Sequence, residues 1–272
     1  MSSTAKDGTV WSSQAQFQTD ADGAFTTTQA PNAGSYLIAD PMGLTQTLTP
    51  GRPGAYFTTP DPWTMVESVA VGGKTVASTT ITRLLPSAAA LHKRDLRPSA
   101  DGVYGEMFQP ASTSTRPAPA VLVFGGSEGG LGNSAITAAL LAAHGFPALA
   151  VAYFDEPDLP QNLEKIPLEY FQRAAQLLAA QPGVDPHRIV LYGDSRGSEA
   201  ALLTAADYPT LVHAVIGAVP SAEAVVGLPD NSVAAWTRDG APVPTGPPSD
   251  FDLQSPTSPA AIPVERSAAR SC

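Results

Sequence analysis

The most constraining feature of the chain is a Gly-x-Ser-x-Gly pentapeptide between an apolar run and an alanine-rich stretch. Residues 189–192 are typical of a buried strand, and residues 200–206 are typical of a helix. Gly193 and Gly197 flank Ser195, so that no side chain crowds a sharp reversal of the chain. We predict a nucleophile elbow, a strained strand-to-helix turn that exposes the Ser195 hydroxyl. The alternative is an ordinary glycine-rich turn with Ser195 as a helix N-cap.

The first hundred residues differ in composition and in apolar pattern from the rest of the chain. They are rich in Thr, Ser, Gly and Pro, and short alternating apolar runs occur at residues 11–17, 65–71 and 76–84. Such runs favour strands, and Gly72-Gly73 between the last two favours a tight hairpin. We therefore predict a small antiparallel β-sandwich for residues 1–100.

From about residue 103 strand-like and helix-like segments alternate. Apolar runs predict strands at residues 118–124, 147–153, 189–192 and 211–219, and helical spacing predicts helices at residues 136–143 and 168–180. This alternation predicts an α/β domain over residues 101–272, with a mostly parallel sheet covered on both faces. After about residue 227 scattered prolines predict an irregular lid or tail, and residues 266–272 show neither a helix nor a strand pattern.

Nucleophilic chemistry at Ser195 would require hydrogen-bond donors for a tetrahedral oxyanion. The backbone N–H of Arg196 is one candidate because it directly follows the serine. We expect the second donor from the glycine loop 125–130, where Ser127 and Glu128 are the candidates. The loop could also be a simple turn at the end of a strand.

A general base for Ser195 is harder to place. His213 is the only histidine after Ser195, and it stands at the start of a predicted strand, at the sheet edge opposite the elbow. His187 precedes the elbow strand and lies at the same edge. The aspartates that follow the elbow do not come after apolar strands: Asp207, Asp230, Asp239, Asp250 and Asp252. The sequence therefore predicts a nucleophile and oxyanion donors without a recognisable acid and base.

Charge and composition exclude several other classes of function. A net charge of -10 and a pI near 4.7 argue against a nucleic-acid partner and against adsorption to anionic membranes. The first eight residues lack an apolar core of the kind that secretory signals have, so we predict a cytoplasmic protein. The single cysteine and four scattered histidines give no metal-ligand spacing, and we expect no metal or cofactor. Oligomeric state is not predicted.

Four motifs in order give the chain a family resemblance. Residues 121–131, 150–160, 166–171 and 193–199 resemble the acyl-CoA thioester hydrolase and bile acid-CoA:amino acid N-acyltransferase family. Residues 11–17, 34–36 and 40–44 resemble the immunoglobulin-like domain that precedes the α/β-hydrolase domain in this family. The resemblance implies that Ser195 attacks an acyl-CoA thioester and releases CoA, after which water or an amine accepts the acyl group.

The resemblance ends near the C-terminus. Residues 262–266 resemble the segment before the strand that carries the family's catalytic aspartate, and the chain then diverges, so we expect a C-terminal truncation without the acid and base. The leading hypothesis is a serine acyl-CoA thioesterase with little or no turnover in this form. The alternatives are a non-catalytic remnant that binds acyl groups or a partner, and a general carboxylesterase with an unrecognised base.

Overall fold

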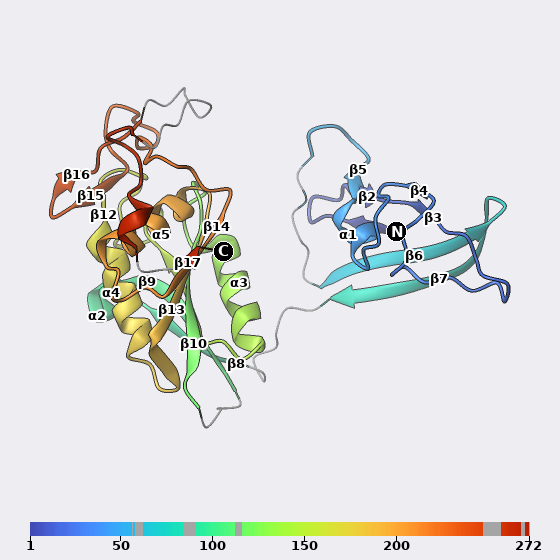
Figure 1. Cartoon of the computed structure of the whole chain (residues 1–272), viewed down its shortest axis with the longest axis horizontal. Helices are drawn as coiled ribbons and strands as arrows, with labels where there is room; N and C mark the ends of the chain where they lie inside the picture. Colours follow the sequence, from blue (N-terminus) through green and yellow to red (C-terminus); the bar gives the residue numbers. More distant parts are fainter. Residues whose placement is uncertain are drawn as a thin grey trace. The chain divides into compact units, whose positions relative to one another are not determined.

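The computed structural model describes residues 1–55, 57, 62–83, 91–111, 116–246 and 257–267, and the backbone at 270–271. The chain divides into two compact units, Met1–Leu85 and Pro86–Cys272 (Figure 1). Strand β8 (Leu91–Leu96) lies ahead of the expected boundary near residue 100, and it pairs with β9 of the second unit. Its backbone pairing places it in the second unit.

The first unit is built from antiparallel strands. Its main sheet has the order β5-β2-β1-β6-β7, and β3 and β4 form a separate pair. The strands are β1 (Ser2–Thr4), β2 (Val10–Ser12), β3 (Ala15–Gln16), β4 (Ala33–Gly34), β5 (Thr49–Pro50), β6 (Trp63–Val71) and β7 (Lys74–Arg83), and α1 (Gly43–Gln46) precedes β5. Gly72 and Gly73 have φ angles of 57° and 79° and join β6 to β7, which confirms the predicted tight hairpin.

The second unit has a seven-stranded sheet in the order β17-β14-β13-β10-β11-β9-β8. The strands β17, β14, β13, β10 and β11 run parallel to their neighbours in this order. Strand β9 is antiparallel to both β11 and β8. The further strands are β9 (Tyr104–Pro110), β10 (Ala118–Phe124), β11 (Ala148–Ala152), β13 (Val184–Asp194), β14 (Ala214–Ala218) and β17 (Arg270–Ser271). The mainly parallel sheet, with its strand-to-helix turn at residue 195, gives this unit an α/β-hydrolase fold, as expected.

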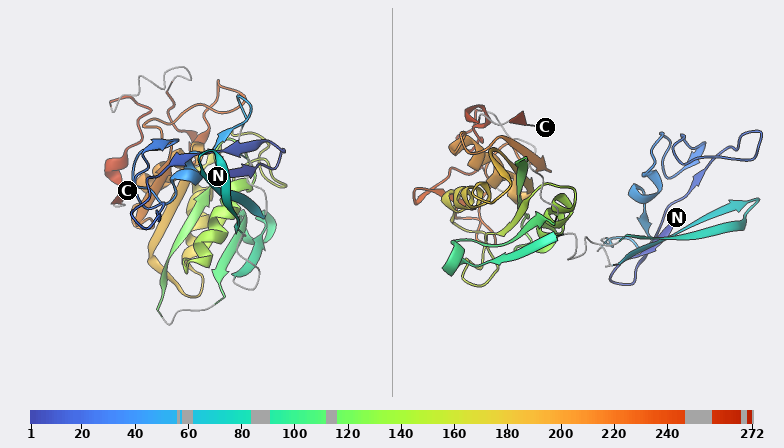
Figure 2. Two further views of the ribbon diagram at one scale, coloured as in Figure 1. Left: turned by 90° about the vertical axis from the view of Figure 1, so that its right-hand side faces the viewer. Right: turned by 90° about the horizontal axis from the view of Figure 1, so that it is seen from below.

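Helices cover both faces of this sheet. The helices are α2 (Pro98–Asp101), α3 (Gly132–Ala143), α4 (Leu168–Ala179) and α5 (Arg196–Asp207) (Figures 1 and 2). Alternate residues of β10 point to opposite faces: Leu122 and Phe124 pack with α4 and α5, while Val121 and Val123 pack with α3. Burial on both faces explains why residues 118–124 form a continuous apolar run.

The C-terminal part is more ordered than its sequence pattern predicts. The structure contains β15 (Trp236–Arg238) and β16 (Ala241–Pro242), which form a small sheet with β12 (Ile166–Pro167), so the predicted irregular lid from residue 227 is only partly irregular.

Residues 266–272 show neither a helix nor a strand pattern in the sequence, yet the described ones among them include regular structure. A 3-10 helix spans Val264–Arg266, and β17 pairs in parallel with β14. Backbone pairing with a neighbouring strand supplies this structure, and it does not require an apolar pattern in the paired segment. Within the described residues, no helix is long and apolar enough to cross a membrane.

Candidate active site

Ser195 occupies a strained turn between β13 and α5. Its φ and ψ angles are 49° and -114°, in a region that residues with a side chain rarely adopt, at a cost of about 1–3 kcal/mol. The N–H of Ser195 donates to the carbonyl oxygen of Ala218 at 2.8 Å, which ties the turn to the end of β14. Ser195 is exposed, and its side chain makes no capping hydrogen bond to α5. The turn is therefore the predicted elbow and not an ordinary serine N-cap.

The two glycines of the pentapeptide allow close backbone packing at this turn. A Cβ on Gly193 would overlap the carbonyl of Gly197, and a Cβ on Gly197 would overlap the carbonyl of Gly125. The second contact brings the glycine loop 125–130 directly against the start of α5. Gly125 and Gly197 thus meet through backbone that leaves no room for a side chain on Gly197.

Arg196 has a buried side chain with a structural role. Its guanidinium pairs with the Glu199 carboxylate at 3.1 Å and donates to the carbonyl oxygens of Val225 and Val226, each at 2.9 Å. Burial lowers the pKa of Arg196 and raises the pKa of Glu199, while each charge partly offsets the shift of the other. Because Arg196 is the first residue of α5, its backbone N–H has no acceptor within the helix and is available beside Ser195.

The glycine loop approaches Ser195 through Gly126. A Cβ on Gly126 would lie 3.3 Å from the Cβ of Ser195, and the N–H of Gly126 donates to the Glu128 carboxylate at 3.1 Å. Ser127 and Glu128, the residues that the sequence singled out, are exposed in the same loop. Sequence reasoning did not name Gly126, although its place in a Gly-Gly pair directly after a buried strand was a signal for it.

Tyr153 lies behind the glycine loop, just after the end of β11. Its hydroxyl lies 2.9 Å from the carbonyl oxygens of both Gly125 and Gly126 and donates its proton to them. The ring is buried and packs against Phe171 and Trp236, with centroid distances of 5.3 Å and 5.7 Å. Burial raises the pKa of Tyr153 far above its usual range, so the phenol remains protonated and acts as a donor.

The histidines nearest to Ser195 in sequence lie at the far edge of the sheet. His213 precedes β14, where its N–H donates to the carbonyl of Ile189, and His187 lies in the first half of β13. Both are exposed and are separated from Ser195 by the length of parallel strands. Among the predicted acids, Asp207 pairs with Arg238 and Asp230 accepts hydrogen bonds from Ser232. Asp250 and Asp252 lie outside the described residues.

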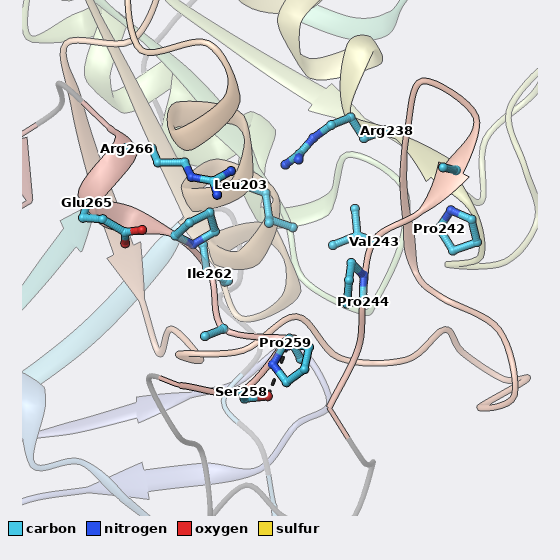
Figure 3. A pocket seen from close by; sticks show the side chains of 14 residues that line it. Leu203, Arg238, Pro242, Val243, Pro244, Ser258, Pro259, Ile262, Glu265 and Arg266 are labelled. Atoms are coloured by element: carbon cyan, nitrogen blue, oxygen red, sulfur yellow. Dashed lines mark hydrogen bonds between the residues drawn. The ribbon is translucent and has the colours of Figure 1, made fainter.

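A separate cavity of about 480 Å³ lies farther along α5 (Figure 3). Leu203, Val243 and Ile262 contribute apolar walls, and the guanidinium groups of Arg238 and Arg266 lie on one side of it. Leu203 is about two helical turns from Ser195. The described lining includes neither Ser195 nor the glycine loop, so this cavity is distinct from the elbow.

Two models of one protein family match the chain. The acyl-CoA thioester hydrolase/BAAT N-terminal region matches residues 1–91, and the BAAT/acyl-CoA thioester hydrolase C-terminal region matches residues 166–231. The chain belongs to the acyl-CoA thioester hydrolase/BAAT family. This membership agrees with the resemblance that the sequence motifs indicate, and the C-terminal match includes the elbow.

Curated relatives of this family member include thioesterases and an acyltransferase. Acyl-coenzyme A thioesterase 6 of Homo sapiens is 33% identical over 209 residues, which cover 72% of this chain and 47% of that protein. Acyl-coenzyme A amino acid N-acyltransferase 1 of Mus musculus is 39% identical over 103 residues, which cover 38% of this chain and 24% of that protein. The chain thus spans about half the length of the curated thioesterases that it matches.

Solved structures show a more distant likeness. A hyperthermophilic esterase from Pyrobaculum calidifontis aligns with 22% identity and a TM-score of 0.41, covering 49% of this chain and 47% of that chain. A dienelactone hydrolase-like phosphotriesterase from metagenomic libraries aligns with 19% identity and a TM-score of 0.45, covering 66% and 79%.

Proposed function

We propose that the chain carries a serine hydrolase site for acyl-CoA thioesters, with Ser195 as the nucleophile. The observation that carries the proposal is the strained backbone of Ser195, which places an exposed hydroxyl at the turn between β13 and α5. Membership of a family whose curated relatives include acyl-CoA thioesterases supports the choice of substrate.

The reaction proceeds through an acyl-enzyme. The Ser195 oxygen forms a bond to the thioester carbon, the carbon–sulfur bond breaks, and the proton lost by the hydroxyl is returned to the leaving CoA thiolate. Water then releases the fatty acid and restores the serine. The overall change is acyl-CoA and water to fatty acid and CoA.

Backbone N–H groups stabilise the oxyanion that forms in each half of the reaction. The N–H of Arg196 is one donor, and the second comes from the loop that contains Ser127 and Glu128, where Gly126 lies close to Ser195. Loss of one such donor lowers the rate by about 10²–10³-fold in a well-studied serine protease. The glycine loop therefore contributes to the rate as well as to the shape of the site.

The test is hydrolysis of a panel of acyl-CoA thioesters by the purified chain, with release of free thiol as the readout. Because the sequence offers no recognisable acid and base, we expect slow turnover at most, and we expect Ser195→Ala to abolish it, because the variant retains the backbone but lacks the nucleophile. Oxyesters of the same acyl groups are measured in parallel. Equal rates for the two proteins would contradict the proposal. Faster cleavage of oxyesters than of thioesters would favour a general carboxylesterase, and tight acyl-CoA binding without turnover would favour a binding role.

A fluorophosphonate provides a second readout that does not depend on turnover. It reacts with an activated serine to form an oxygen–phosphorus bond with loss of fluoride, and mass spectrometry of the digested protein identifies the modified residue. We expect the label on Ser195. A label on another serine, or none at all, would contradict the role of Ser195.

A further inference from the structure

The hydroxyl of Tyr153 holds two successive peptide groups of the glycine loop. It contacts the carbonyl oxygens of Gly125 and Gly126 at the same distance of 2.9 Å, so its proton is shared between them. The hydroxyl is buried, where a hydrogen bond to a carbonyl replaces water that cannot enter. Both peptides therefore turn their oxygens towards the same side chain.

Because a peptide group is planar, these two contacts also fix the orientation of two N–H groups. In a trans peptide the C=O and the N–H point in opposite directions, so fixing the carbonyl of Gly125 also fixes the N–H of Gly126. The carbonyl of Gly126 fixes the N–H of Ser127 in the same way. Glycine has few steric limits on its backbone angles, so a Gly-Gly segment needs such an outside contact to keep one orientation.

The side opposite Tyr153 already holds a negative charge. The N–H of Gly126 donates to one oxygen of the Glu128 carboxylate, and the other oxygen lies 2.8 Å from the position that a Cβ on Gly126 would occupy. The Cβ of Ser195 lies 3.3 Å from that same position. The N–H that Tyr153 orients thus donates to an anionic group close to the candidate nucleophile, so its direction suits an anion bound at this point.

The ring of Tyr153 is itself fixed by the elements around the elbow. It packs against Trp236, whose indole N–H donates to Glu199 at 2.8 Å, and Glu199 pairs with Arg196. The residue after Ser195 and the glycine loop are therefore linked through one buried network. A shift of the Tyr153 hydroxyl would require these packed groups to move.

We propose that Tyr153 is a positioning residue that turns the N–H groups of Gly126 and Ser127 towards the oxyanion beside Ser195. The contribution of Tyr153 to catalysis rests on the proposed function of Ser195. The effect of Tyr153 on the orientation of the loop does not depend on that function. Tyr153 touches no reacting atom. It acts only through the two peptides that it holds.

Tyr153→Phe tests this role, and Tyr170→Phe is the matched control. Both changes remove one phenol oxygen that is hydrogen-bonded to the backbone and retain the ring. The Tyr170 hydroxyl accepts from the N–H of Tyr104 at 2.8 Å and donates to the carbonyl of Ala152 at 2.6 Å, so its loss removes two hydrogen bonds without touching the glycine loop. We expect both variants to melt at lower temperatures than the parent chain, by similar amounts.

Only the Tyr153 variant should lose reactivity at Ser195. We expect phosphonylation of Ser195 to slow by about 10–100-fold in Tyr153→Phe and to stay within twofold in Tyr170→Phe. The loss in Tyr153→Phe is smaller than the loss of one whole oxyanion donor because both N–H groups remain and only their orientation is released. In thioester hydrolysis kcat should fall while KM changes little. Equal phosphonylation rates in the two variants would overturn the proposal, because a merely structural hydroxyl affects both alike.

Amide NMR of glycine- and serine-labelled protein separates this inference from the proposed function. Tyr153→Phe should shift the Gly126 and Ser127 amide signals, and Tyr170→Phe should leave them in place. Shifted amides together with a Ser195 that never reacts would support the orienting role of Tyr153 and contradict the nucleophile. Unmoved amides in Tyr153→Phe would overturn the orienting role, whatever the reactivity of Ser195.

Discussion

At the scale of single residues, the Glu128 carboxylate occupies a hydrogen-bond donor close to the elbow. Sequence reasoning named it as part of the oxyanion loop, and the structure places its carboxylate as an acceptor on the N–H of Gly126. A carboxylate at this position occupies a donor that an oxyanion would use, and its charge opposes the charge that develops there. If Ser195 is the nucleophile that we propose, Glu128 should therefore limit its reactivity for as long as the carboxylate keeps this position.

Glu128→Ala should raise the rate of phosphonylation at Ser195. We expect an increase of about tenfold, equivalent to about 1.4 kcal/mol, because the Gly126 N–H becomes available and a nearby negative charge is removed. Stopped-flow or timed labelling measures the rate.

Glu156→Ala is the control for Glu128→Ala. Its carboxylate lies near Gly130 at the other end of the same loop, so the variant removes an equal charge without changing the Gly126 N–H. We expect its labelling rate to match that of the parent chain. Slower labelling in Glu128→Ala would mean that the carboxylate assists Ser195 as a base.

A second residue-scale prediction concerns the buried pair of Arg196 and Glu199. Glu199 is 2% exposed and accepts hydrogen bonds from the Trp236 indole and the Val225 N–H. Glu199→Gln should lower the free energy of unfolding by about 3–5 kcal/mol, because it leaves the Arg196 charge buried without a counter-charge. Urea unfolding measures the loss.

The double variant Arg196→Met with Glu199→Leu tests whether the uncompensated charge causes that loss. Removing both charges together leaves no unpaired ion, so we expect the double variant to be at least as stable as Glu199→Gln. A double variant that is less stable by the sum of two separate losses would show that the hydrogen bonds matter more than the charges.

At the scale of elements, the sequence best predicts those helices and turns whose formation depends on consecutive residues. The expected helix at residues 168–180 matches α4 to within one residue, because its apolar spacing faces the sheet at every turn. The hairpin at Gly72-Gly73 is equally local, since two positive φ angles require glycine. The predicted elbow strand, in contrast, began at residue 189, whereas β13 begins at Val184, because pairing with β10 extends the strand into polar sequence.

The site shows the same division between local and tertiary information. The turn at Ser195 was predictable because its glycines and its flanking strand and helix are consecutive in sequence. Tyr153 contacts Gly126 across a separation of 27 residues in the sequence. Trp236 contacts Glu199 across a separation of 37 residues. Only packing reveals these contacts, which is why Gly126 and the role of Trp236 were missed.

At the scale of the whole molecule, the two units should unfold separately. The described part of the first unit buries few apolar side chains, with Ala5, Tyr36 and Met65 among them, whereas the second unit has two large clusters. We therefore expect two transitions in calorimetry, with the first unit unfolding at the lower temperature.

Replacing Gly72 and Gly73 by alanine should identify the lower transition. Each change forces a side chain into a positive-φ conformation at a cost of about 1–2 kcal/mol, so the lower transition should move and the upper one should stay. The rate of Ser195 phosphonylation serves as the control and should not change. A single transition, or two that move together, would contradict separate unfolding.

The backbone contact between Gly197 and Gly125 also limits how this site can evolve. Because a side chain at position 197 would strike the carbonyl of Gly125, acceptable replacements depend on the course of a loop that is encoded some seventy residues earlier. No single later mutation in α5 can relieve that clash. Substitutions at position 197 and in the glycine loop should therefore depend on each other, whereas the exposed side chain of Ser195 is free of this steric constraint.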